Sequence, residues 1–219
     1  MSKNSKNLDM VLALNKETYA LETKNYHAVK TKKTQIIIGG SLRNENNHIA
    51  HLKIKDFGHT KSWPTFSITR EGKIYQHFDP IYFSEYMGIR EIDKKAVSIV
   101  LENMGNLVYD ANKEKFVNWI NEEVENAEKQ VGEQLWKNYR YWEKYTAPQC
   151  ESLVGLCNYL IKELDIKLDA IGHNVLETEI DLTSFQGIVT RSNYDSEYTD
   201  LNPMFNWNKF LKMMNISID

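Results

Sequence analysis

The stretch that decides the fold is Tyr198-Thr199-Asp200-Leu201-Asn202-Pro203-Met204-Phe205-Asn206-Trp207, near the end of the chain. It contains a Thr-Asp pair that leads, through Leu201-Asn202, into a Pro-x-Phe-x-Trp segment. Proline is tolerated in the first turn of a helix, because the backbone amides there have no intrahelical partners. Asn202-Pro203 therefore predicts a helix start, and Phe210 and Leu211 continue the apolar side of that helix.

A longer helix is predicted upstream of this stretch. Thr146-Ala147-Pro148-Gln149 has the pattern of a capping box, in which the Thr146 hydroxyl accepts from the Gln149 amide and the Gln149 side chain reaches back. The apolar residues that follow share one helical face: Leu153, Leu156, Cys157, Leu160, Ile161 and Leu164. We expect Cys150 and Cys157 to be core thiols on this helix.

Several strands are predicted before this helix. Gln35–Ile38 is a β-branched run that ends at two glycines, as a buried strand ending in a turn does. Phe66–Thr69 and Ile74–Phe78 flank a turn and predict a hairpin. Val97–Leu101 is almost continuously apolar, which is typical of a central strand. The order of these segments predicts an α/β domain with helices packed on a central sheet.

The remaining organisation follows from composition. The chain has 219 residues, of which 42% are hydrophobic and 26% charged, as expected for one globular domain. Residues 1–33 are polar and Lys-rich and predict an N-terminal extension that is solvated or orders against a protein partner. We place the domain at residues 34–219. Phe116 to Gln130 has apolar residues at helical spacing, so we expect a helical insertion at about 110–135.

Composition also argues against several partners and compartments. The net charge of −3 gives no reason to expect nucleic-acid binding. No apolar run approaches the ~20 residues that a membrane span needs. Met1–Asn7 is polar and predicts no secretory signal. We expect a protein that is cytoplasmic when made. A role at the cell wall would then depend on release by lysis or on carriage within a phage particle.

Taken in order, the segments resemble the zinc N-acetylmuramoyl-L-alanine amidase and peptidoglycan-recognition protein superfamily, over roughly residues 34–212. The similar segments are the first strand (Ile36–Gly39), the hairpin (Trp63–Gln76), the Ser-Ile-x-Ile-Glu strand (Ser98–Asn103), the Tyr-Thr-x-x-Gln helix start (Tyr145–Gln149) and the signature that closes the zinc site (Thr199–Trp207). The resemblance implies a single amidase-like domain whose central mixed β-sheet is flanked by helices.

The resemblance also implies a zinc site with three protein ligands and one open position. The metal of such a site polarises the scissile carbonyl and lowers the pKa of its bound water toward ~7. The third ligand position is Asp200, which keeps a carboxylate. The first ligand position, a His in the family, is Gly39, which has no side chain to offer a metal.

The second ligand position, also a His in the family, can be aligned in two ways. One alignment places Arg191 there, and a guanidinium stays protonated and does not coordinate zinc. Arg191 would instead bring a positive charge to the place of the metal and pair with Asp200. The other alignment uses Gly172-His173, with residues 174–190 as an insertion, and makes His173 the ligand.

Four further positions are candidates for the cleft. Tyr198 stands where the family often has a Lys that stabilises the developing oxyanion, and a phenol can donate a hydrogen bond but carries no charge. Pro64 and Thr65 stand at the hairpin positions of a Tyr and a His. Glu102 follows the strand expected to line the cleft, where it would act as a base or as a structural partner of a cation.

The residues leave three hypotheses. The first is a catalytically inactive protein without a cofactor that binds peptidoglycan or muropeptide or serves as a structural domain of a particle. The second is an active zinc amidase that cleaves the bond between N-acetylmuramic acid and L-alanine, with His173, Asp200 and one of His48, His51 and His59 as ligands. The third is an assembly protein that uses the fold as a frame.

Overall fold

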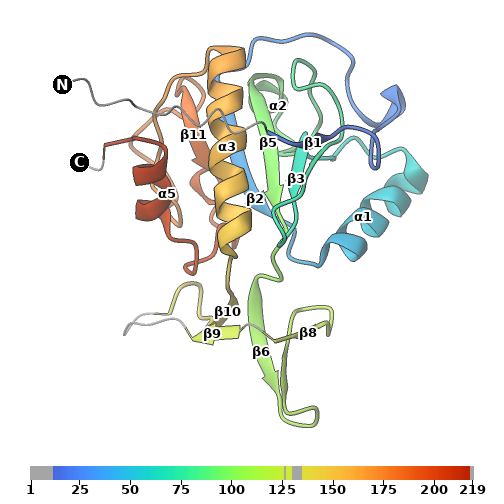
Figure 1. Cartoon of the computed structure of the whole chain (residues 1–219), viewed down its shortest axis with the longest axis vertical. Helices are drawn as coiled ribbons and strands as arrows, with labels where there is room; N and C mark the ends of the chain where they lie inside the picture. Colours follow the sequence, from blue (N-terminus) through green and yellow to red (C-terminus); the bar gives the residue numbers. More distant parts are fainter. Residues whose placement is uncertain (1–11, 126, 130–134, 218–219) are drawn as a thin grey trace, which may run out of the picture.

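The computed structural model describes residues 12–125, 127–129 and 135–217. Their strands form two sheets, one of six strands and one of five. Figure 1 shows the six-stranded sheet in the main body of the molecule and the five-stranded sheet below it. The chain passes to the small sheet after β5 and returns from it before α3.

The large sheet is mixed, as predicted. Its strands, in spatial order, are β1 (Leu14–Asn15), β4 (Ile74–Gln76), β3 (Phe66–Ile68), β5 (Ala96–Leu101), β2 (Gln35–Gly40) and β11 (Gly187–Thr190). The pair β3–β4 is antiparallel and forms the predicted hairpin, whereas the other neighbouring pairs are parallel. The predicted central position of β5, between β3 and β2, is confirmed.

Helices cover both faces of the large sheet. The described helices are η1 (Thr23–Asn25), α1 (Glu45–Ile54), η2 (Lys55–Gly58), α2 (Arg90–Lys95), α3 (Ala147–Leu164), α4 (Arg191–Tyr194) and α5 (Trp207–Met213). None of these described helices combines the length and the apolar character that crossing a membrane requires.

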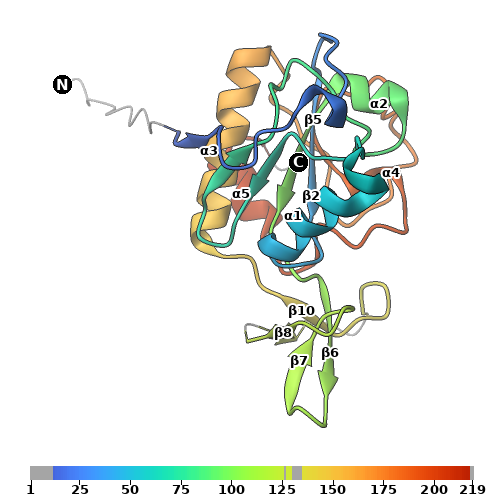
Figure 2. The ribbon, with the colours of Figure 1, turned by 90° about the vertical axis from the view of Figure 1, so that its right-hand side faces the viewer.

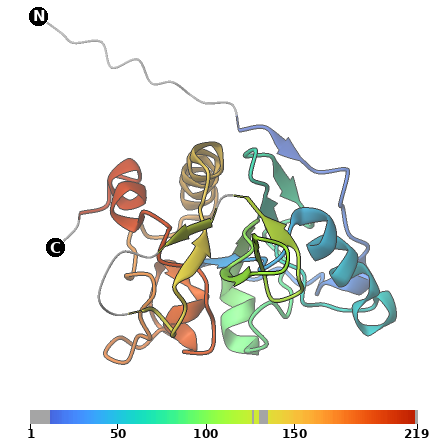
Figure 3. The ribbon, with the colours of Figure 1, turned by 90° about the horizontal axis from the view of Figure 1, so that it is seen from below.

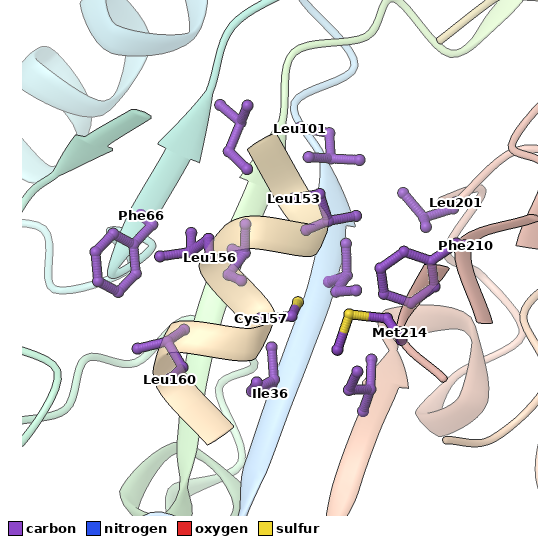
Figure 4. Packing of buried hydrophobic residues seen from close by; sticks show 14 of the residues in the cluster. Ile36, Phe66, Leu101, Leu153, Leu156, Cys157, Leu160, Leu201, Phe210 and Met214 are labelled. Atoms are coloured by element: carbon purple, nitrogen blue, oxygen red, sulfur yellow. The ribbon is translucent and has the colours of Figure 1, made fainter. Parts of the chain in front are cut away.

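The two faces of β2 show why its residues are apolar without interruption. Ile36 and Ile38 belong to the cluster beneath α3 and α5, which also holds Leu156 and Cys157 (Figure 4). Ile37 belongs to a second cluster on the opposite face. Because successive side chains of a strand point to opposite faces, a strand buried on both sides needs apolar residues at every position.

The start of α3 confirms one half of the predicted capping box. The Thr146 hydroxyl accepts from the Gln149 amide at 3.3 Å. The Gln149 side chain, however, does not reach back to Thr146. It donates to the carbonyls of Ile68, at 3.2 Å, and Glu102, at 2.9 Å. The prediction for this side chain was wrong because the buried side-chain amide donates instead to two carbonyls at the ends of neighbouring strands, which need hydrogen-bond donors.

The last helix begins later than predicted. Its first residue is Trp207, and Asn206 caps it by accepting from the Lys209 amide at 2.9 Å. The Asn202 side chain is instead buried, and its amide donates to Asn103 Oδ1 at 2.9 Å. Asn202 therefore joins two distant segments rather than starting a helix.

The prediction of a helical insertion at about 110–135 was wrong. The described residues there are part of the small sheet, whose strands in spatial order are β8 (Glu123–Val124), β7 (Lys115–Val117), β6 (Asn106–Asp110), β10 (Tyr141–Glu143) and β9 (Ala127–Lys129). Phe116 and Val124, whose spacing resembles that of a helix face, are cross-strand partners. Phe116 also packs against Tyr109 and Tyr141. Such pairs stabilise a sheet.

The described part of the N-terminal segment, residues 12–33, packs on the domain. Leu12 and Leu14 contact the core cluster beneath α3. Tyr26 stacks on Phe78 with ring centroids 4.9 Å apart. Lys33 is 2% exposed, and its ammonium donates to the Lys94 carbonyl at 2.9 Å. The prediction that this segment is solvated or orders only against a partner was wrong for these residues. Residues 1–11 lie outside the described part, and the boundary at residue 33 stays a prediction.

Candidate functional site

A cleft of about 440 Å³ opens at the carboxyl end of β2, beside α1 and the start of α4. Residues far apart in the chain line it, among them Gly40, His48, Tyr86, Arg191 and Tyr198. Figure 2 shows α1 on this side of the large sheet, above the small sheet. A larger cavity of about 890 Å³ lies between β1 and α3, and none of the predicted site residues line it.

An ion pair lies beside the end of β2. Arg191 Nε donates to Asp200 Oδ2 at 2.7 Å, and Arg191 Nη2 donates to the Gly40 carbonyl at 2.9 Å. The Gly40 amide donates to the same Asp200 oxygen at 2.7 Å. Asp200 is 1% exposed. The pair predicted between Arg191 and Asp200 is therefore confirmed. Each of its two side chains is also hydrogen-bonded to the backbone of Gly40 in β2.

The surroundings of Arg191 keep it charged. Burial lowers the pKa of the guanidinium, but the Asp200 carboxylate together with the Tyr86 and Tyr198 phenols outweighs burial, so that the pKa lies above its ordinary value. The guanidinium carbon lies 4.6 Å from the ring centroid of Tyr198 and 5.4 Å from that of Tyr86. A cation between two aromatic rings is further stabilised by their quadrupoles.

Gly39 leaves the space that this ion pair fills. A Cβ atom at Gly39 would lie 2.3 Å from the Tyr86 hydroxyl, 2.7 Å from Arg191 Nε and 2.7 Å from Asp200 Oδ2. Real Cβ atoms essentially never approach other atoms so closely. The absence of a side chain at position 39 and the presence of Arg191 are therefore two parts of one arrangement.

The residues present do not fit the zinc ion that the fold implies. Gly39 offers no donor atom, and Arg191 brings a fixed positive charge that would repel a divalent cation. One Asp200 oxygen is already engaged by Arg191 and Gly40, although Oδ1 is buried without a hydrogen-bond partner. Among the described residues no three His, Cys, Asp or Glu side chains lie close enough together to hold a metal ion.

The alternative ligand His173 lies elsewhere. Its ring stacks on Trp207 with centroids 5.3 Å apart. It lines a separate cavity together with Pro203 and Asn208, and not the cleft of Arg191 and Tyr198. Burial lowers the pKa of His173 to about 4. The geometry therefore places His173 in an aromatic cluster beside α5, away from the ion pair.

The histidines of the 48–59 segment divide between two places. His48 and His51 lie on α1 and line the cleft, whereas His59 is exposed after η2 and does not. Nε2 of His48 is buried without a hydrogen-bond partner. Burial, followed by the nearby His77 and Arg191, lowers the pKa of His48 to about 3. His48 is therefore neutral, and its ring nitrogen without a partner is shielded from solvent.

Two of the predicted cleft residues lie behind its wall. Thr65 is 2% exposed, and its hydroxyl meets that of Ser98 at 3.3 Å. Gly39 is buried, and its neighbour Gly40 lines the cleft instead. Similarly Pro64, and not Thr65, lines the cleft. Gly39 is covered because Tyr86 and Arg191 occupy the space where its side chain would lie, and these two residues line the cleft themselves.

Glu102 holds two turns of the backbone. Its Oε1 accepts from the Glu45 amide at 3.0 Å, at the start of α1, and its Oε2 accepts from the Arg70 amide at 2.9 Å, in the hairpin turn. Both carboxylate oxygens are thus engaged by backbone amides, which is a structural role but not the predicted pairing with the side chain of a cation. Tyr198, by contrast, lines the cleft. Catalytic roles for Glu102 and Tyr198 stay predictions.

Several lining residues were not singled out from the sequence, among them Tyr86, Arg43 and Trp119. Tyr86 supplies a buried hydroxyl without a partner, and burial raises the pKa of this phenol. Arg43 and Trp119 lie together at the rim, with the Arg43 guanidinium carbon 4.8 Å from the centroid of the Trp119 ring. Tyr86 and Trp119 belong to loops without a recognisable motif, so no signal in the sequence could have assigned them to the cleft.

Comparison with known proteins supports the fold. No protein-family model and no curated protein matches the chain. The endolysin amidase LysCS from Clostridium intestinale URNW has a similar structure, with a TM-score of 0.53, 13% identity and a match over 93% of this chain and 95% of that one.

Two further similar structures hold ligands. The N-acetylmuramyl-L-alanine amidase AmiD from E. coli, in complex with the substrate anhydro-N-acetylmuramic acid-L-Ala-D-gamma-Glu-L-Lys, has a TM-score of 0.54 and 16% identity, over 94% of this chain and 66% of that one. AmpDh3 from Pseudomonas aeruginosa, in complex with anhydromuramic pentapeptide, has a TM-score of 0.52 and 10% identity, over 94% of this chain and 67% of that one. The chain thus has the fold of N-acetylmuramoyl-L-alanine amidases, as the sequence motifs predicted.

Proposed function

We propose that this protein binds peptidoglycan fragments in its cleft without cleaving them. The observation that carries the proposal is the ion pair of Arg191 and Asp200 at the end of β2, next to a glycine. An amidase of this fold needs a metal that polarises a carbonyl and activates water. A buried guanidinium cannot bind and activate a water as the metal does, because it has no coordination position and does not release its proton.

The arrangement also supplies the positive charge that a metal would bring to Asp200. A buried carboxylate without a counter-charge is costly, and here the counter-charge is Arg191. The guanidinium is held by Asp200 and by the Gly40 carbonyl. The fold therefore has no need of a zinc ion to compensate Asp200.

Binding is supported by the character of the cleft. Its volume of about 440 Å³ lies within the range of small-molecule sites. Arg43, Lys55 and Arg191 bring positive charge to its lining, with Glu85 as the acidic side chain there. Two proteins of similar structure hold muropeptides, one of which contains a gamma-linked Glu and therefore a free carboxylate. Such carboxylates match the cations of this cleft.

The test uses the purified full chain. We expect less than stoichiometric zinc by metal analysis, co-sedimentation with cell-wall sacculi that a chelator does not change, and no clearing of a sacculus suspension. Zinc at one ion per chain, together with clearing that a chelator abolishes, would establish the active zinc amidase instead. Failure to sediment with sacculi would refute binding.

A charge reversal in the cleft tests where binding occurs. Lys55 lines the cleft, whereas Lys162 is an exposed lysine on α3 that lines the other cavity. We expect Lys55→Glu to weaken binding to sacculi roughly tenfold, because it places a negative charge opposite ligand carboxylates. The matched variant Lys162→Glu should bind like the unchanged protein. If the two variants weakened binding equally, the protein's attraction to sacculi would arise from its whole surface and not from the cleft.

A further inference from the structure

The small sheet contributes an aromatic side chain to the cleft of the large sheet. Trp119 lies in the turn between β7 and β8, is 57% exposed, and lines the cleft together with Arg43 and Lys55. Tryptophan combines a large apolar surface with a polar N–H and is enriched where proteins contact partners.

The ring is fixed in place from two sides. Its Nε1 donates to the Leu42 carbonyl at 2.9 Å. The guanidinium carbon of Arg43 lies 4.8 Å from the ring centroid. A side chain held in this way loses little further freedom when a ligand contacts it, which favours binding.

The turn that carries Trp119 is itself tied to α1. Glu122 accepts from the side-chain amide of Asn44 at 2.5 Å and from that of Asn47. Its other oxygen accepts from the Asn118 side chain at 2.6 Å. These bonds join the small sheet to the first turn of α1, so the position of Trp119 relative to the cleft is set by the fold. Figure 3, seen from below, shows the small sheet in front of the large one, beside α1.

We infer that Trp119 and Arg43 form a subsite for a sugar ring of the glycan strand, at the rim of the cleft. One face of a pyranose carries mainly C–H groups, and burying that face against an indole removes apolar surface from water. The hydroxyl and N-acetyl groups at the ring edge can accept hydrogen bonds from the guanidinium of Arg43. This inference rests on the proposed binding of peptidoglycan and assigns the sugar to the small sheet and the peptide to the large one.

Other surface aromatics do not meet these conditions. Tyr109 is 49% exposed, and it lies on β6 and does not line the cleft. It therefore provides a matched control on the same sheet.

The experiment compares Trp119→Ala, Trp119→Phe and Tyr109→Ala in the full chain. The probes are intact sacculi and glycan strands from which the stem peptides have been removed. We expect Trp119→Ala to bind the peptide-free strands about tenfold more weakly, which corresponds to the loss of one aromatic contact surface. Trp119→Phe should keep most of the affinity, and Tyr109→Ala should keep all of it. Circular dichroism and thermal melting confirm that each variant is folded.

The outcomes separate this inference from the proposed function. If the unchanged protein sediments with sacculi but Trp119→Ala binds peptide-free strands equally well, the sugar subsite is refuted and the proposed function stands. Binding of sacculi without any binding of peptide-free strands also refutes the subsite. If the unchanged protein does not sediment with sacculi, the proposed function fails, and the subsite fails with it.

Discussion

The large and the small sheet are built on different principles. Among the described residues, the three buried apolar clusters consist of residues before 102 or after 144. In the small sheet the buried apolar side chains are fewer and include Leu107, Val117 and Trp142, while Val108 and Tyr109 are exposed. The large sheet is therefore stabilised by its own core, whereas the small sheet relies on aromatic pairs and on its attachment to the large one.

That attachment is polar. Glu143 pairs with Arg70 at 2.9 Å, and its carbonyl accepts from the side chains of Asn103, at 3.2 Å, and Asn202, at 3.1 Å. Burial raises the pKa of Glu143, and the charge of Arg70 opposes that shift. This difference shows that the apolar core stabilises the fold, while polar contacts between the two sheets determine where the rim of the cleft lies.

The largest effect should come from breaking the ion pair at the end of β2. Asp200→Ala would leave the guanidinium of Arg191 buried without its counter-charge, and we expect a loss of about 3–5 kcal/mol in the free energy of unfolding. The double variant Arg191→Met with Asp200→Leu should recover most of that loss, because no charge stays buried. Urea unfolding measures both. A loss below about 1 kcal/mol in Asp200→Ala would mean that the pair behaves like a surface pair.

Truncating one buried side chain in each part of the molecule should have an intermediate effect on stability and should distinguish the large sheet from the small one. Leu156 is fully buried beneath the large sheet, and Leu156→Ala should cost about 2–5 kcal/mol of global stability through the cavity that it leaves. Val117 is 6% exposed, and Val117→Ala should cost roughly 1–2 kcal/mol. Hydrogen exchange should show that Val117→Ala increases exchange in the small sheet alone. Equal exchange in both sheets would contradict the comparison, because it would mean that they unfold as one unit.

The smallest effect is a pH dependence that belongs to the large sheet. All six histidines lie outside residues 104–143, and burial lowers the pKa of His48 to about 3 and those of His77 and His173 to about 4. An unfolded His has a pKa near ~6.5. Between that value and about 4 the unfolded chain therefore binds more protons, so stability is full above pH ~6.5 and falls on acidification.

Each such histidine should contribute ~1.4 kcal/mol per pH unit within this window. His77→Asn should therefore reduce the slope of unfolding free energy against pH by about one proton, whatever it does to stability at neutral pH. Denaturant unfolding at a series of pH values between about 4.5 and 7 tests this. An unchanged slope would mean that His77 is not buried in its neutral form.

Much of the large sheet was predictable because its signals are local. The uninterrupted apolar run of β2, the turn before β4 and the Thr146 cap are each determined by residues close together in the chain. The ion pair of Arg191 and Asp200 was also within reach, because one of the two alignments to the family places Arg191 at the second ligand position and Asp200 at the third. The small sheet was not, since the spacing of Phe116 and Val124 suits a helix face and a cross-strand pair equally well.

The residues of this chain were enough to indicate an α/β amidase-like domain, a ligand position without a side chain at Gly39 and a cation at Arg191. Those conclusions follow from the resemblance of short motifs to the amidase superfamily and from side-chain chemistry, neither of which depends on distant contacts. The positions of Tyr86, Trp119 and His173 depend on how loops and strands far apart in the chain pack together. Such contacts depend on the packing and hydrogen bonding of the whole chain, and a short segment of sequence does not determine them.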